Sequence, residues 1–241
     1  MASPGYSLFT LVSDLKVFLL GGYQSFPITM AGTLIILGFM TANYAMLFFL
    51  VGLVIGVPIA TWLFNLALGA LFTFFSLSDN SWVFPRASSV CDIIGSAADA
   101  SSTEKGPFAS YWITMTMFFF GYLIGNAVTL YSLAPVYPSA DPDVKAKVDQ
   151  QVMMRQSQTV IGLITIALFV IVFLVMRVSS KCDAIIPAIF ATGLFGAFGY
   201  GWYKALAATG KNTLSDLFGI ANRLMSPDSL QNEPIGCIPQ N

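Results

Sequence analysis

Long uncharged stretches divide the chain, and their lengths match those of membrane-spanning helices. No residue between Ile28 and Phe75 carries a charge, and 48 residues of helix would be about 72 Å long at ~1.5 Å per residue. The hydrocarbon core of a bilayer is about 30 Å thick, so this stretch must hold two spans and a tight turn. The polar residues 41–44 (TANY) are the preferred turn, and residues 52–58 are the second choice.

The remaining apolar stretches predict three further spans. Tyr111 and Trp112 open the clearest one and Tyr131 closes it, which is the spacing of two aromatic interface belts. Pro58 lacks a backbone donor and should kink the second span. We therefore predict an all-α, polytopic transmembrane bundle (residues 26–208) of about five spans with its termini on opposite sides: residues 26–41, 45–75, 111–131, 159–177 and 184–208.

A helix should begin well before the fourth span. Pro142 stands between two Asp residues, which favours a helix start because Asp caps N-termini and Pro suits the first position. No breaker follows before residue 159, so the polar segment 135–158 should continue into the span as one long helix. A stripe on this segment should dock onto a partner, either a loop of the same chain or a neighbouring protein. It consists of Val144, Val148 and Val152, with Met153 and Met154 nearby.

Three other segments complete the organisation. Residues 1–25 form an amphipathic segment that lies in the membrane interface or packs against the bundle edge. The segment 76–110 is polar, and loops of this length are often functional or partner-bound. The segment 209–241 starts as an amphipathic helix, with the capping pair Thr213 and Asp216, and ends as an irregular tail.

Small residues recur every four positions in three of the predicted spans. Such spacing lets a second helix approach closely inside a membrane. We interpret these positions as contacts for helix packing within the protein: Gly52 and Gly56, Gly121 and Gly125, and Gly193, Ala197 and Gly201.

Composition supports the membrane interpretation and narrows the partners. Of 241 residues, 56% are hydrophobic and 10% are charged, whereas soluble domains carry about 25% charged residues. The net charge of −1 gives no electrostatic footprint for nucleic acid. Five spans divide the 11 basic residues five to six between the two sides, so the orientation stays open.

The residues that carry enzyme chemistry are scarce. The chain has no His, and its three Cys are too scattered for a zinc site. We expect no catalytic, metal or cofactor site, no enzyme activity and no small-molecule substrate. Two alternatives stay open for the thiols: three unpaired Cys, or a disulfide between Cys91 and Cys182, which five spans place on one side. Asn65 and Asn126 should form hydrogen bonds between helices.

One set of motifs resembles a known group of proteins. Residues 107–112 (PFASYW), 118–122 (FFFGY) and 125–127 (GNA) resemble hydrophobic proteins of large icosahedral nucleocytoplasmic DNA viruses, and residues 26–29 (FPIT) are similar in style. The resemblance covers about the first 135 residues and rests mostly on apolar motifs. It implies a multi-pass protein of the membrane beneath a capsid, a minor capsid component, and it brings no catalytic residues.

These observations favour a structural membrane protein that anchors a protein layer. Its partners would be membrane lipid and other capsid or membrane proteins. A transporter or channel subunit is the alternative, although the apolar interiors of the spans hold no ionisable residue, the usual sign of an ion pathway. A cellular tetraspan-like vesicle protein is a third interpretation.

Overall fold

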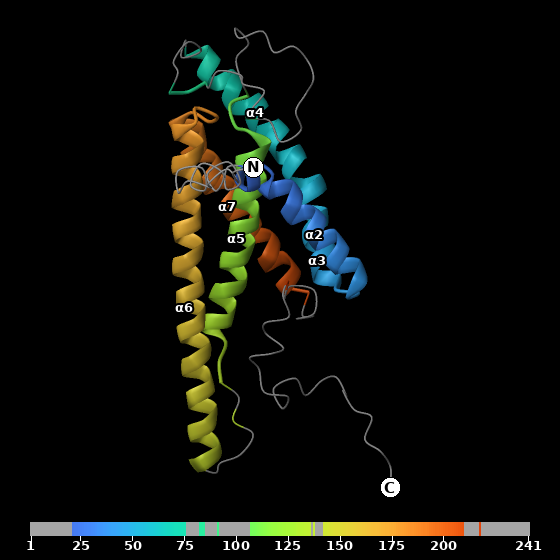
Figure 1. Ribbon diagram of the computed structural model, residues 1–241, viewed down its shortest axis with the longest axis vertical. Coiled ribbons are helices and arrows are strands. Elements are labelled where there is room, and N and C mark those ends of the chain that lie inside the picture. The colour runs from blue at the N-terminus through green and yellow to red at the C-terminus, as the bar shows by residue number, and fades with distance from the viewer. Residues whose placement is uncertain are drawn as a thin grey trace, which may run out of the picture.

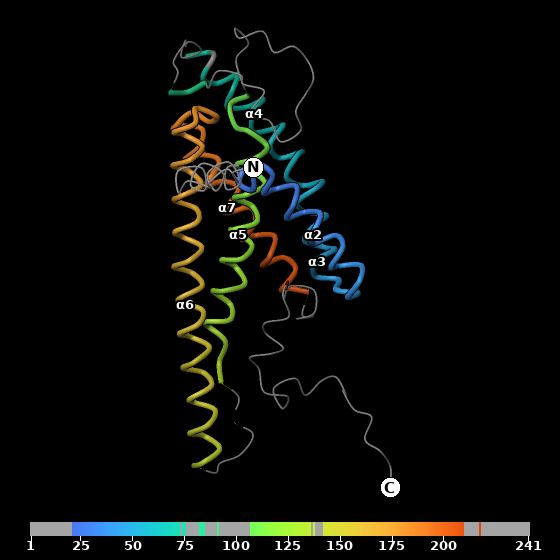
Figure 2. The backbone as a smooth tube through the Cα atoms, viewed as in Figure 1, coloured from blue at the N-terminus to red at the C-terminus, as the bar shows by residue number. Residues whose placement is uncertain are grey.

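The described part of the molecule is built from helices alone (Figures 1 and 2). A computed structural model describes residues 21–75, 82–84, 91, 107–135, 137, 142–209 and 217. Most of the predicted terminal amphipathic segments and of the segment 76–110 lie outside these residues. The elements are α2 (Phe26–Met40), α3 (Tyr44–Val51), the π-helix η1 (Gly52–Gly56), α4 (Val57–Phe74), α5 (Tyr111–Ser132), α6 (Pro142–Ser179) and α7 (Ile185–Ala207).

Four helices are long and apolar enough to cross a bilayer. They are the continuous unit Tyr44–Phe72, α5, α6 and α7, and the 15-residue α2 is a shorter apolar helix beside them. The prediction of an all-α bundle of about five spans is therefore confirmed. The chain is an integral membrane protein.

Helix α5 is the centre of the bundle, and it contacts α2, α4, η1, α6 and α7. Thirteen of its 22 residues are buried. Helix α6 is different, because only three of its 38 residues are buried and all three are polar: Arg155, Thr159 and Arg177. Apolar side chains of α6 such as Ile161 and Leu168 are exposed. Apolar residues outside and polar residues inside are the arrangement expected when lipid surrounds the helix.

The turn between the first two helices lies at the predicted position. Helix α2 ends at Met40, and the Asn43 side chain accepts a hydrogen bond from the Ala45 N–H (3.0 Å), which caps α3. Ala42 between them has a φ of 50°, in the left-handed region. Asn is a favoured cap because its short side chain reaches the free N–H groups of the first turn.

The predicted kink at Pro58 takes the form of a π-helix just before it. The Val57 N–H bonds to the Gly52 carbonyl, five residues back. Pro58 supplies no N–H, so the regular hydrogen-bond ladder is interrupted here, and such interruptions commonly accompany π-bulges. The second-choice turn at residues 52–58 is therefore a helical irregularity, and the chain crosses it without reversing direction.

Helices α5 and α7 approach so closely that their backbones touch. A Cβ added at Gly121 would collide with the Gly196 carbonyl, and one added at Gly199 would collide with the Phe118 carbonyl. A Cβ at Gly125 would lie 2.8 Å from the Tyr203 ring. These glycines have no side chain, and this allows the two helices to lie so close together.

The glycines of the second span also face α7. A Cβ at Gly52 would lie 2.7 Å from the Trp202 indole, and one at Gly56 would lie 3.3 Å from the Phe198 ring. The Trp202 Nε1–H donates to the Phe48 carbonyl (3.2 Å) next to the π-helix. The pair in this span therefore receives aromatic side chains of a neighbouring helix.

The prediction of the packing face of α7 is wrong. Gly193, Ala197 and Gly201 are exposed, and a Cβ at Gly193 or Gly201 would meet no atom within 4 Å. The buried face of α7 is instead formed by Ala188, Ala191, Phe195, Gly199 and Tyr203. Small residues occur on both faces of this helix, and only one of them faces the bundle.

Candidate functional site

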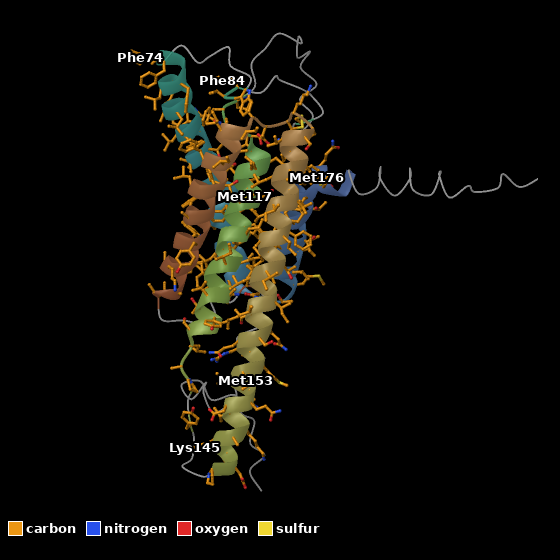
Figure 3. All side chains as sticks on the ribbon, turned by 90° about the vertical axis from the view of Figure 1, so that its left-hand side faces the viewer. Phe74, Phe84, Met117, Lys145, Met153 and Met176 are labelled. Carbon is orange, nitrogen blue, oxygen red and sulfur yellow. A yellow bond between two sulfur atoms is a disulfide. The ribbon has the colours of Figure 1, made fainter. Side chains whose placement is uncertain are left out.

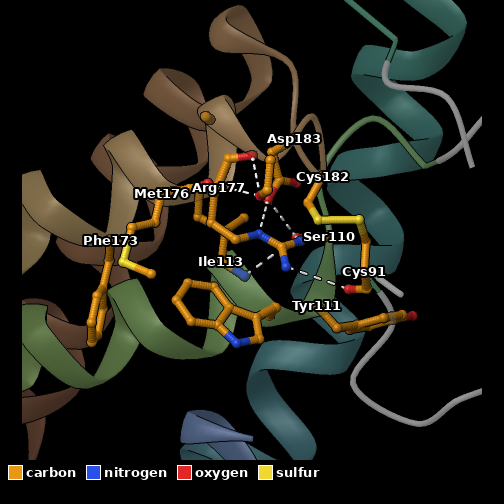
Figure 4. Close-up of polar contacts among 12 residues, drawn as sticks. Cys91, Ser110, Tyr111, Ile113, Phe173, Met176, Arg177, Cys182 and Asp183 are labelled. Atoms are coloured by element: carbon orange, nitrogen blue, oxygen red, sulfur yellow. Dashed lines mark hydrogen bonds and ion pairs between the residues drawn. A yellow bond between two sulfur atoms is a disulfide. The ribbon is translucent and has the colours of Figure 1, made fainter. Parts of the chain in front are cut away.

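A buried polar cluster ties together the ends of three helices at one end of the bundle (Figure 4). Arg177 lies near the end of α6 and is 1% exposed, and its Nε forms an ion pair with Asp183 at 2.5 Å. Ser110 lies immediately before α5, and its Oγ accepts from Arg177 (3.0 Å) and donates to Asp183 (3.1 Å). We call Cys91, Ser110, Arg177, Cys182 and Asp183 the cap junction.

Ser110 has two tasks because it is also the N-cap of α5. Its Oγ accepts from the Ile113 N–H at 3.4 Å as well as from Arg177. A hydroxyl has one proton to donate and two lone pairs to accept, so all three are used. The start of α5 is thereby fixed to the end of α6.

The cap junction includes a disulfide between Cys91 and Cys182, whose Cα atoms are 5.3 Å apart. Arg177 contacts both halves of it. Its Nη1 donates to the Cys91 carbonyl (3.4 Å), and its own carbonyl accepts from the Cys182 N–H (3.1 Å). Of the two alternatives left open by the sequence, the structure has the paired one.

Trp112 closes the cap junction on the side of the membrane interior. Its ring lies 5.0 Å from the Arg177 guanidinium carbon, within the range of a cation–π contact. Its Nε1–H donates to the carbonyls of Tyr23 (3.2 Å) and Gln24 (3.1 Å). The chain before α2 is thus joined to the same end of the bundle.

The contacts of the cap junction join three segments of the chain to one another. Each nitrogen of the Arg177 guanidinium has a partner, namely Asp183, Ser110 or the Cys91 carbonyl. A buried pair of this kind needs full satisfaction to be tolerated, and here it is satisfied.

A second feature stands at the opposite end, where α6 extends beyond the bundle. We call residues 142–158 the α6 projection, and 17 residues of helix are about 25 Å long at ~1.5 Å per residue. In Figure 3, Lys145 and Met153 lie on this part, far from Phe74 and Phe84 at the other end. The prediction of one unbroken helix from Pro142 into the fourth span agrees with α6.

The chain after α5 braces the α6 projection. Arg155 is 5% exposed and donates from Nη2 to the Leu133 carbonyl at 2.5 Å. The Tyr137 hydroxyl donates to Asp149 Oδ1 at 2.8 Å. This bond raises the pKa of Tyr137, because ionisation of the phenol would remove the donated proton and place two negative charges together.

The predicted docking residues are half-buried, while their neighbours are exposed. Val144, Val148 and Val152 are of intermediate exposure and lie on the same side of α6 as Arg155. Met153 and Met154 are 70% and 56% exposed. At 100° per residue Met153 points about 160° away from Arg155 and Met154 about 100° away, so both methionines lie outside the side occupied by Arg155 and the valines.

Polar side chains inside the bundle also find partners. Asn65 donates to the Ala109 carbonyl (3.0 Å) and accepts from the Ala109 N–H (2.7 Å), so it joins α4 to the chain entering α5. The Thr61 hydroxyl donates to Thr114 at 2.9 Å. Asn126 is buried within α5.

Sequence reasoning missed the centre of the cap junction. It placed Arg177 only as the residue that closes the fourth span, and it gave Asp183 and Ser110 no role. A signal was present, since a chain with 10% charged residues places Arg177 and Asp183 six residues apart between two spans. Ser110 directly before Tyr111 is likewise a typical N-cap position.

These features define a class: an integral membrane protein with a helical bundle, a disulfide-linked cap junction at one end and a braced helix at the other. Within the described residues, no group of three or more His, Cys, Asp or Glu side chains could hold a metal ion. Compared with known protein families, curated proteins and solved structures, the chain matches none.

Proposed function

We propose that this protein is a structural membrane protein that anchors a protein layer to a bilayer through the α6 projection. The observation that carries the proposal is the continuity of α6 from residue 142 to residue 179. A helix that is fixed inside the membrane and continues about 25 Å beyond it holds a surface at a constant distance from the lipid.

The brace supports this role because it makes the projection stiff. Arg155 and Asp149 of the projection bind Leu133 and Tyr137 of the chain that follows α5. A segment that is ordered before binding loses less conformational entropy when a partner binds. A stiff projection therefore suits attachment better than a flexible tail would.

The outward face of the projection has the chemistry of a helix-docking surface. Ala146, Gln150, Met153, Met154 and Ser157 are all exposed and share this face at helical spacing. Small residues permit close approach, and Met side chains adapt to an apolar partner. The partner expected here is an apolar-faced segment of a layer protein, and the resemblance to viral membrane proteins points to a capsid layer.

The proposal is tested by a double substitution on the outward face. Met153→Lys with Met154→Lys should lower recovery of layer proteins with the membrane at least tenfold, because two charges enter an apolar contact. Gln151→Lys is the matched control, since residue 151 is exposed on the same projection and is not one of the five residues of the outward face. Purified particles that carry the capsid layer should contain the wild type and the Gln151→Lys control, and should lack the double variant.

Three results would contradict the proposal. The first is unchanged particle incorporation of the double variant with unchanged thermal stability. The second is solute flux through liposomes that hold only this protein, which belongs to a channel or transporter. The third is recovery of the protein only in cellular vesicles, which belongs to a tetraspan-like protein.

A further inference from the structure

The two polar features lie at opposite ends of one helix. Helix α6 begins at Pro142 in the α6 projection and reaches the cap junction at Arg177. Figure 3 places Lys145 and Met176 far apart along this helix, with the bundle beside the Met176 end. The membrane lies between the two ends, so the compartment of one end determines the compartment of the other.

Hydrogen bonds between Arg177 and the backbones of Cys91 and Cys182 hold the two cysteines in place within the cap junction. Arg177 holds Cys91 through its carbonyl and Cys182 through its N–H, as described above. The Cα separation of 5.3 Å lies within the usual range for bridged cysteines. Folding of the cap junction therefore brings the two thiols together. They form the disulfide wherever an oxidant is present.

The disulfide indicates which compartment the cap junction faces. Disulfides persist in the lumen of the secretory pathway, at cell and particle surfaces and in the periplasm, and they are rare where thiol reductants are abundant. We infer that the cap junction faces an oxidising compartment, and that the α6 projection stands on the reducing, cytosolic side of the membrane. Counting basic residues gives no competing indication, because five and six fall on the two sides.

The inference also places the partner of the projection. If the projection is the anchoring surface proposed above, the protein layer assembles on the cytosolic side, on the membrane face opposite the disulfide. This last step rests on the proposed function. The orientation itself depends only on the disulfide and the course of α6.

The test uses two single thiols on the same helix. Both variants are made in full-length protein with Cys237→Ser, so that the paired cysteines remain and one free thiol is added. Lys145→Cys puts it on the projection, and Ser179→Cys puts it at the opposite end of α6, where the side chain is also exposed. Sealed microsomes with the cytosolic side outward are treated with a membrane-impermeant maleimide, before and after detergent permeabilisation.

The expected result is labelling of Cys at position 145 in sealed microsomes, and labelling at position 179 only after permeabilisation. Without added thiol in the Cys237→Ser protein, denaturation and alkylation should modify neither Cys91 nor Cys182 until a reductant is added. The reverse labelling pattern would overturn the orientation, and alkylation without reductant would overturn its basis. Neither result depends on Met153 and Met154, so this test and the test of anchoring fail independently.

Discussion

At the scale of single residues, the buried polar side chains differ in how well they are satisfied. Each nitrogen of the Arg177 guanidinium has a partner, Ser110 uses its one proton and both lone pairs, and Thr114 receives a bond from Thr61. Thr116, one helical turn away from Trp112 and fully buried, has a hydroxyl without a hydrogen-bond partner, and among the described residues Arg155 Nε is the other buried side-chain atom that lacks one. An unpaired buried hydroxyl costs about 1–3 kcal/mol.

This contrast gives a prediction with a built-in comparison. Thr116→Val should raise the free energy of unfolding in detergent by about 1 kcal/mol, since it removes an unpaired hydroxyl at nearly constant shape. Thr114→Val should lower it by about 1 kcal/mol, because Thr61 and the start of α5 lose a partner. Thermal unfolding of both variants measures the difference, and equal effects of the two substitutions would refute the assignment.

At the scale of elements, the contact between α5 and α7 depends on two backbones touching. Gly199→Ala should lower stability by at least about 1–3 kcal/mol, because the new Cβ would collide with the Phe118 carbonyl, and a backbone cannot move aside cheaply. Gly193→Ala on the same helix is the control, since no atom lies within 4 Å of the added methyl group. Stability in detergent should be unchanged or slightly raised for the control; equal loss in both would mean that the contact is unimportant.

The brace of the α6 projection should respond to alkaline pH. The pKa of Tyr137 is raised by its bond to Asp149, so the bond stabilises the brace fully below the ordinary tyrosine pKa of about 10. The stabilisation is lost as the pH rises through the raised pKa in the folded state. Limited proteolysis of the projection should accelerate there in wild type, while Tyr137→Phe should show the faster rate already at neutral pH. A wild-type rate that stays constant across this range would exclude the role of the bond.

Sequence patterns predicted the elements well and their contacts poorly, for a physical reason. The turn at Asn43 and the start of α6 at Pro142 depend on local preferences that a single sequence displays. Which face of α7 meets α5 depends on neighbours, and lipid removes the contrast between apolar interior and polar exterior that marks a buried face in water. Gly193 and Gly199 look alike along the chain, yet only Gly199 lies in the contact.

The functional features divide in the same way. Continuity of α6 could be predicted because no Gly or Pro interrupts residues 143–158 before the fourth span. The pairing of Cys91 with Cys182 could be offered only as one of two alternatives, because it depends on Arg177 bringing two segments 91 residues apart to one place. The valines at 144, 148 and 152 were an incomplete guide to docking, since the brace occupies their side of the helix.

At the scale of the whole molecule, the disulfide joins Cys91 to Cys182 and closes a loop of 91 residues. Removing it with Cys91→Ser should lower the free energy of unfolding by up to about 4–5 kcal/mol, the chain-entropy value for a loop of this length. Cys237→Ser is the matched control and should leave stability unchanged, because Cys237 takes no part in this bond. Reduction of the wild type in detergent should reproduce the loss. Identical melting of oxidised and reduced protein would mean that the other contacts of the cap junction suffice.

Because α6 is unbroken, it acts as a lever that pivots at the membrane surface, its fulcrum: when its membrane-spanning part tilts, the α6 projection tilts with it. Helices adjust to bilayer thickness by tilting, and a rigid helix carries the same tilt on both sides of the fulcrum. A tilt of about 10° would displace the tip of an arm of about 25 Å by roughly 4 Å. A layer attached to that tip would therefore be shifted by thickening or thinning of the lipid beneath it, without any change in the binding surface itself.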